Sequence, residues 1–82
     1  MKFRYYPETD SLYIEFSENP SADSEEIAPN VVLDFDADRN LVGIDIDHAS
    51  KIINLARLEM ESFPLQALVF NNPQRAAMTL AE

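Results

Sequence analysis

The most constraining part of the sequence is VVLDFDADRNLVGIDID, residues 31–47, which reads as two strands around an acidic turn. On both sides of the turn, apolar residues alternate with acidic or small ones. Strict alternation places each set on one face of a strand, and a slip of one residue would mix the two sets. We therefore predict a β-hairpin with apolar side chains on one face and carboxylates on the other. The predicted pairs are Asp36 with Leu41, Phe35 with Val42, Leu33 with Ile44, and Val31 with Ile46.

The turn of this hairpin contains an arginine where a tight loop favours glycine. A two-residue loop would need positive φ at Arg39, and a non-glycine residue in the left-handed region costs roughly 1–2 kcal/mol. We predict instead a four-residue loop, residues 37–40, in which Asn40 adopts the left-handed conformation and the register is unchanged. Gly43, the only glycine of the chain, stands opposite Asp34 in this register and indicates a close approach of backbone or side chain across the hairpin.

A second hairpin is predicted over residues 2–16, around a proline-containing turn at residues 7–10. Alternation in its two strands again separates apolar from charged residues. Residues 24–28 are expected to form a short edge strand, because Pro29 cannot donate a ladder hydrogen bond. The predicted pairs of this hairpin are Tyr5 with Leu12, Phe3 with Ile14, Lys2 with Glu15, and Arg4 with Tyr13.

The sequence after the second strand of the central hairpin, from residue 50 onward, indicates helix. Apolar residues recur at helical spacing over residues 50–63, Asp47 or Ser50 can cap the start, and a proline ends the segment. Residues 65–70, LQALVF, fit either a strand or a buried helix, and periodicity does not decide between them. Residues 72–80 begin with Asn-Pro and fit a final short helix.

Together these segments predict an α+β fold in a single domain, residues 1–82. The expected architecture is an antiparallel β-meander of four to five strands, with one face covered by the first helix, plus a second short helix. A chain of 82 residues has room for one core, and 46% hydrophobic residues are typical of a globular domain. Residues 1–51 would form the β-rich part, and residues 52–82 a helical, apolar tail.

The composition is strongly acidic, with 15 acidic and 6 basic residues and a formal net charge of −9. Nucleic acid binding needs clustered lysines and arginines, so this charge argues against a nucleic acid and favours solubility, cations or a basic protein partner. The chain has no cysteine, which excludes disulfides and thiolate sites. The opening MKFRYY is too short and polar for a signal peptide, and no apolar run reaches the length of a membrane span. We therefore expect a cytoplasmic protein without membrane contact.

The first 51 residues contain several distinctive short motifs: YPETDSLYI at residues 6–14, EIAP at 26–29, VLD at 32–34, LVGI at 41–44, and Ala49-Ser50. Taken in order, these motifs resemble a small bacterial family, the domain of unknown function numbered 2283. Its members usually carry glycine where this chain has Arg39. The resemblance implies an α+β fold and no established activity. Genes for small toxin-like proteins beside those of some members imply an antitoxin-like role.

The acidic hairpin also contains a partial calcium-loop pattern. Its carboxylates and Asn40 match most ligand positions of an EF-hand loop, but Arg39 replaces the required glycine and strands replace the flanking helices. We therefore predict no metal, cofactor or catalytic site, and expect these carboxylates to be solvated. The alternative is a carboxylate-based or divalent-metal-dependent enzyme, for which the weak candidates are Asp34, Asp36 and Asp45.

The apolar tail adds more hydrophobic surface than one covering helix requires. Either a second helix completes the same core, or the tail forms an interface with another chain. We expect a homodimer through the tail, since association also enlarges a small core. The predicted function is a small acidic protein-interaction module without enzymatic activity, in the manner of an antitoxin that neutralises a basic partner. The predicted interaction residues are Leu65, Leu68, Val69 and Phe70.

Overall fold

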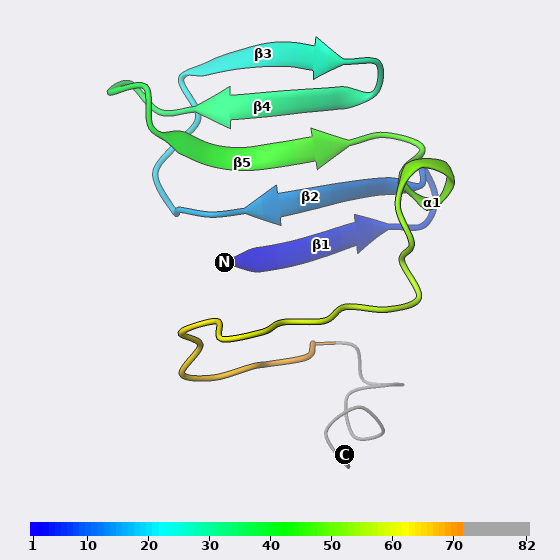
Figure 1. Cartoon of the computed structure of the whole chain (residues 1–82). Coiled ribbons are helices and arrows are strands. Elements are labelled where there is room, and N and C mark those ends of the chain that lie inside the picture. The colour runs from blue at the N-terminus through cyan, green and yellow to red at the C-terminus, as the bar shows by residue number, and fades with distance from the viewer. Residues whose placement is uncertain (72–82) are drawn as a thin grey trace.

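The structure, a computed structural model, describes residues 1–71. Over this range the chain forms a five-stranded antiparallel sheet with the strand order β1-β2-β5-β4-β3, and a short helix follows β5 (Figure 1). The fold is mostly β. The elements are β1 (Lys2–Tyr6), β2 (Ser11–Glu15), β3 (Asp23–Ala28), β4 (Val31–Phe35), β5 (Leu41–Ile46) and α1 (Ala49–Ile52).

The hairpin of β1 and β2 has the predicted register. Tyr5 lies opposite Leu12, Arg4 lies opposite Tyr13, and the remaining predicted pairs are also present. A guanidinium nitrogen of Arg4 lies 3.7 Å from a carboxylate oxygen of Glu15, an ion pair near the surface that adds little to stability. At the other side of the sheet, β3 pairs with β4 and is an edge strand, as predicted.

The hairpin of β4 and β5 keeps the predicted register up to Asp34, which lies opposite Gly43. Beside the turn the prediction is wrong. Phe35 pairs with Leu41 and not with Val42, because a β-bulge shifts the register after Asp34. Val42 is only 2% exposed, so the bulge buries this residue instead of placing it opposite Phe35.

The turn between β4 and β5 also differs from the prediction. The backbone N–H of Asp36 donates to the carbonyl of Asn40 over 2.9 Å, so Asp36 closes the turn instead of pairing with a strand residue. Arg39, not Asn40, has the left-handed conformation, with φ 67°. The guanidinium of Arg39 makes two contacts at the surface: a 2.9 Å ion pair with Asp23 and a position 4.7 Å from the centre of the Phe35 ring.

The strand order corrects the predicted meander. β2 is followed in the chain by β3, but it pairs with β5, where Leu12 lies opposite Ile46 and Ile14 opposite Ile44. The apolar residues of β2 need an apolar neighbour, and β5 supplies one. β3 has one large apolar residue, Ile27, which is 56% exposed. The first hairpin therefore packs beside β5, and the other three strands form a meander of their own.

The predicted helix over residues 50–63 is wrong in length. α1 ends at Ile52, and the chain continues as an extended trace (Figure 1). Ile53 already has extended dihedrals, with φ −129° and ψ 158°. The side chain of Asn54 accepts a 2.9 Å hydrogen bond from the backbone N–H of Ala56, and such local bonds compete with helix formation. In the described part of the chain, no substantial helix covers the sheet.

The later tail also differs from its predicted structure. Residues 65–70 form neither a strand nor a helix. The second short helix predicted over residues 72–80 lies outside the described residues.

The alternation gives the sheet two chemically different faces. Cross-strand partners point to the same side, so the registers define the members of each face. The apolar face consists of Phe3, Tyr5, Leu12, Ile14, Val31, Leu33, Ile44 and Ile46. The carboxylate face contains Tyr13, Glu15, Val32, Asp34, Gly43 and Asp45 on its three central strands.

The core is small and lies where α1 meets the apolar face. Leu12 and Ile46 are buried beneath Ala49, which is fully covered, and Ile53 packs against this cluster. Within residues 1–71, the buried hydrophobic side chains are those of Leu12, Ile46, Ala49 and Val42. A helix of four residues therefore protects one end of the apolar face and leaves the remainder half-exposed.

Candidate functional site

The carboxylate face is built by β2, β5 and β4, whose alternation places an aromatic residue between acidic ones. The hydroxyl of Tyr13 donates to Oδ2 of Asp34 over 3.0 Å. The hydroxyl of Ser24, on the neighbouring β3, donates to Oδ1 of the same carboxylate over 2.6 Å. Asp34 is therefore held in place by two hydrogen bonds, which differs from the freely solvated carboxylate that the sequence suggested.

Gly43 allows this arrangement. A Cβ atom built on Gly43 would lie 2.5 Å from Cζ of Tyr13, closer still to its hydroxyl, and 3.1 Å from the carbonyl oxygen of Ile14. The ring of Tyr13 thus lies directly over the glycine and reaches across β5 to Asp34. A close approach at Gly43 is present, but it comes from Tyr13 of β2 and not, as predicted, from across the β4–β5 hairpin.

The electrostatics of this face follow from its acid content. Burial, the hydrogen bond to Asp34 and nearby carboxylate charges raise the pKa of Tyr13 to about 12. Burial and the charges of Asp47 and Asp34 raise the pKa of Asp45 above its usual value. The surroundings of Asp45 therefore disfavour its charged form, and a positive group placed beside it would favour that form.

Asp36 corrects the prediction that all hairpin carboxylates are solvated. It is 6% exposed and is the buried charged residue of the described chain. Its Oδ1 accepts hydrogen bonds of 2.9 Å from the backbone N–H groups of Asp38 and Asn40, and its Oδ2 accepts one of 3.2 Å from Asn19. Asp36 thus organises the turn, and its lone pairs already have partners.

We expect Asp36→Ala to lower the urea midpoint at pH 7 well below that of Asp38→Ala. The hydrogen bonds, chiefly that from the backbone of Asn40, lower the pKa of Asp36 below the ordinary value of an aspartate. A depressed folded-state pKa stabilises the fold above the unfolded pKa, and this stabilisation is lost as the pH falls through the folded pKa. The difference in urea midpoint between wild type and Asp36→Ala should therefore become smaller below about pH 4. A gap that widens in acid would contradict this role.

Asp10 forms a second hydrogen-bonded centre that the sequence analysis missed. Its carboxylate accepts from the hydroxyl of Tyr5 at 2.6 Å and from the hydroxyl and backbone N–H of Ser50 at 2.7 and 3.2 Å. Its carbonyl accepts from the backbone N–H of Ala49. These bonds, that from Tyr5 first, lower the pKa of Asp10. His48 at the N-cap makes no side-chain capping bond. The hydrogen bonds to Asp10, in a turn distant in sequence, hold the start of the helix instead.

The three weak candidates of the enzymatic alternative do not form one site. Asp34 and Asp45 lie on the carboxylate face, whereas Asp36 is enclosed by the turn. Among residues 1–71, no group of three histidine, cysteine or acidic side chains has an arrangement that could hold a metal ion. Acid–base chemistry by paired carboxylates also requires a cleft in which the two carboxyl groups have different pKa values.

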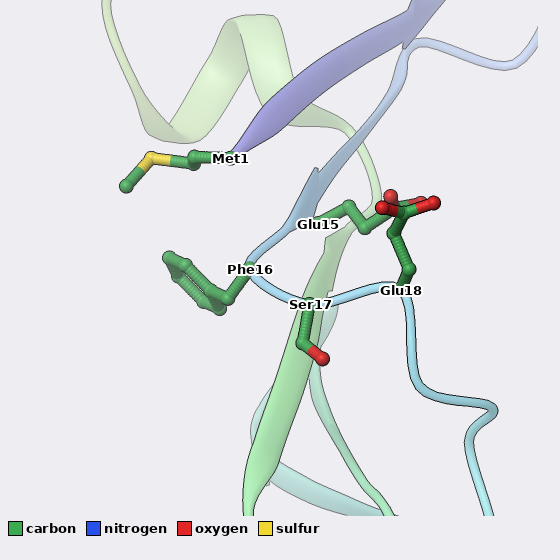
Figure 2. Close-up of a pocket in the computed structure, with 5 residues that line it drawn as sticks. All are labelled: Met1, Glu15, Phe16, Ser17 and Glu18. Atoms are coloured by element: carbon green, nitrogen blue, oxygen red, sulfur yellow. The ribbon is translucent and has the colours of Figure 1, made fainter. Parts of the chain in front are cut away.

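The surface hollows are open and acidic. One, of about 210 Å³, is lined by residues of β2 and the following loop together with Met1 (Figure 2). In this view Glu15 and Glu18 extend to one side, and Met1 and Phe16 point to the other. A second hollow, of about 320 Å³, lies along residues 26–29. Enclosed small-molecule sites bury most of their ligand, so these open hollows suit a side chain of a larger partner better.

The predicted interaction residues of the tail lie at the surface. Leu65 and Leu68 are each 44% exposed, Val69 is 72% exposed, and Phe70 is half-buried. In the described range, these residues belong to no regular element, so they do not complete the core as a packed helix. Within the same range, the chain has no helix of the length and apolarity that crossing a membrane requires.

Comparisons with known proteins give one match. No curated protein and no solved structure matches the chain. The family model described as "Protein of unknown function (DUF2283)" matches residues 2–50, which are more than half of the sequence and include the whole sheet. The predicted resemblance is confirmed, and the chain belongs to this family of unknown function.

Proposed function

We propose that this protein is a small acidic interaction module whose carboxylate face binds a basic protein partner, in the manner of an antitoxin that neutralises its target. The observation that carries the proposal is the separation of charge. On β2, β4 and β5, every acidic side chain within the strands lies on one face, and the other face of these strands is uncharged. The proposed compartment is the cytoplasm, in keeping with a cysteine-free sequence.

Three features of the carboxylate face support a basic partner. Asp45 has a raised pKa through burial and carboxylate neighbours, so an incoming arginine or lysine would be stabilised there. Tyr13 offers an aromatic ring beside these charges, and guanidinium groups stack on such rings. The net charge of −9 would also attract a basic protein over long range at low salt.

We further propose that the protein is a homodimer through its tail. The four interaction residues of the tail leave apolar surface uncovered, and residues 62–71 carry no charge. An uncharged apolar segment on a strongly acidic chain is the part on which two copies can meet without repulsion. The carboxylate faces would then point away from the contact and remain free for the partner.

We expect neutralisation of two carboxylates on the face to weaken binding of a basic probe, for which we choose an arginine-rich peptide. The Glu15→Gln and Asp45→Asn double variant should bind the peptide about tenfold more weakly than wild type in calorimetry at low salt, a loss of about 1.4 kcal/mol in binding free energy. The reason is that two carboxylates which attract the peptide are removed. Glu8→Gln with Glu61→Gln is the matched control, since it removes the same charge away from the face. Equal losses in both double variants would show unspecific attraction and contradict the assigned surface.

A further inference from the structure

The apolar face of the sheet is open at the β1 side. Phe3 and Tyr5 are 49% and 44% exposed, although both point to the same side as the buried Leu12. On β1, β2, β4 and β5 this face carries no charged residue. The short α1 covers the β2–β5 end, so the aromatic residues of β1 form the uncovered remainder.

The tail, which follows α1, is a second apolar surface that is exposed, like the open face of the sheet. Seven large apolar side chains between α1 and residue 70 are exposed by 41–72%. They follow directly on Ile53, which packs against the core on the apolar side of the sheet. The tail therefore begins beside the open face, but its own apolar side chains remain uncovered there. The seven residues are Leu55, Leu58, Met60, Phe63, Leu65, Leu68 and Val69.

We propose that the tail of one copy covers the open apolar face of a second copy, and that the second copy returns the same contact. This exchange rests on the homodimer proposed above and names the surface that receives the tail. The reciprocal contact is closed under a twofold axis, so it ends at two chains and does not form a fibre.

The area available matches what a stable dimer needs. A buried aromatic side chain covers about 150–250 Å². Three of the nine exposed side chains of the face and tail are aromatic, and the other six are smaller. Together they expose roughly 700–900 Å² per chain, against about 800 Å² per partner in a standard interface. Burial of this surface would also remove an uncharged apolar window that favours aggregation when it is left exposed.

The charge distribution selects a second copy as the occupant. A basic partner would be drawn to the carboxylate face, whereas the open face offers it no acidic group on β1, β2, β4 or β5. Another copy of this chain brings an uncharged segment, residues 62–71, to an uncharged surface. Its carboxylate face then points away, so the two acidic surfaces do not oppose each other.

Engineered cysteines test whether the contact occurs between chains, because the native chain has no cysteine. Phe3→Cys or Tyr5→Cys is combined with Leu65→Cys or Leu68→Cys in the full-length protein, which is then oxidised and run without reductant. We expect a disulfide-linked dimer for at least one of the four pairs. A cross-linked monomer would show that the tail folds onto its own sheet. A dimer by light scattering that forms no cross-link would overturn the exchange and leave the tail-mediated homodimer standing.

A charge placed on the open face provides a second test. Phe3→Glu should raise the dimer dissociation constant more than about tenfold in sedimentation analysis, because it buries a carboxylate in an apolar contact. Tyr6→Glu is the matched control on the same strand, 47% exposed in the wild type and directed to the opposite face. It should change the constant less than about threefold. Circular dichroism verifies that both variants fold, and equal effects would overturn the proposal.

If the unmodified chain is monomeric at tens of micromolar concentration, the exchange and the homodimer both fail. Binding of the arginine-rich peptide to the carboxylate face is measured separately and does not depend on that result. The two proposals can therefore fail independently.

Discussion

Replacement of Leu12 by alanine is expected to lower the free energy of unfolding by about 2–5 kcal/mol, a large part of the total stability of a domain of this size. Leu12 is 7% exposed and lies in the cluster with Ile46 and Ala49. Few other side chains are buried in the described chain, so little can rearrange to fill the cavity. Urea unfolding followed by circular dichroism measures the loss.

Leu41→Ala is the matched control for this prediction. It removes the same atoms from a strand of the same sheet, but Leu41 is 39% exposed. We expect it to cost less than about 1 kcal/mol, as surface substitutions generally do. If Leu41→Ala costs as much as Leu12→Ala, the core does not lie under α1 as described.

Gly43→Ala is expected to destabilise the protein by about 1–3 kcal/mol, although alanine normally suits a strand better than glycine. The new methyl group would collide with the ring of Tyr13 and approach the carbonyl oxygen of Ile14. The ring would have to leave its place over β5 and would lose its hydrogen bond to Asp34. Chemical denaturation of the single variant measures this cost.

A double-mutant cycle with Tyr13→Ala tests the cause of that loss. Without the ring, the methyl group meets only the carbonyl of Ile14 at 3.1 Å, which a small shift relieves. Gly43→Ala should then be neutral or stabilise by up to about 1 kcal/mol, so that the sign of its effect changes with the residue at position 13. Equal costs in both backgrounds would mean that Tyr13 does not occupy this space.

The two hairpins could be predicted because their information is local. In each, the alternation and a nearby turn favour one register. All four predicted pairs of the β1–β2 hairpin are present, whereas in the β4–β5 hairpin the two pairs away from the turn are present and the two beside it are not. The order of the strands could not be predicted in this way. Whether β2 pairs with β3 or with β5 depends on which strand offers apolar partners to the apolar residues of β2. Periodicity describes one segment at a time, so it cannot compare two segments that are distant in sequence. The predicted helix failed for a different reason, because helical spacing after residue 50 does not show whether a helix there would be packed, and α1 ends at Ile52.

The candidate surface was predicted in part for the same reasons. Alternation alone places Asp34 and Asp45 together on the face opposite the apolar residues. It gives no sign that Asp36 is buried, because that depends on the bulge and on a contact from Asn19. The bond between Asp10 and Ser50 joins positions 40 residues apart, and neither position alone suggests the other.

The placement of β2 beside β5 has a consequence for the order in which the protein folds. The three strands β3, β4 and β5 are joined by short turns and can pair soon after they are made. The β1–β2 hairpin is made first, yet its neighbour in the sheet is β5, the last strand within residues 1–71. Leu12 can therefore pair only after Ile46 has been made. During synthesis an aromatic hairpin therefore emerges long before the surface that protects it, and this interval is when the chain is most exposed to misassembly. Closure of that distant pairing should be the slow step of folding, since it requires the largest loop to be ordered.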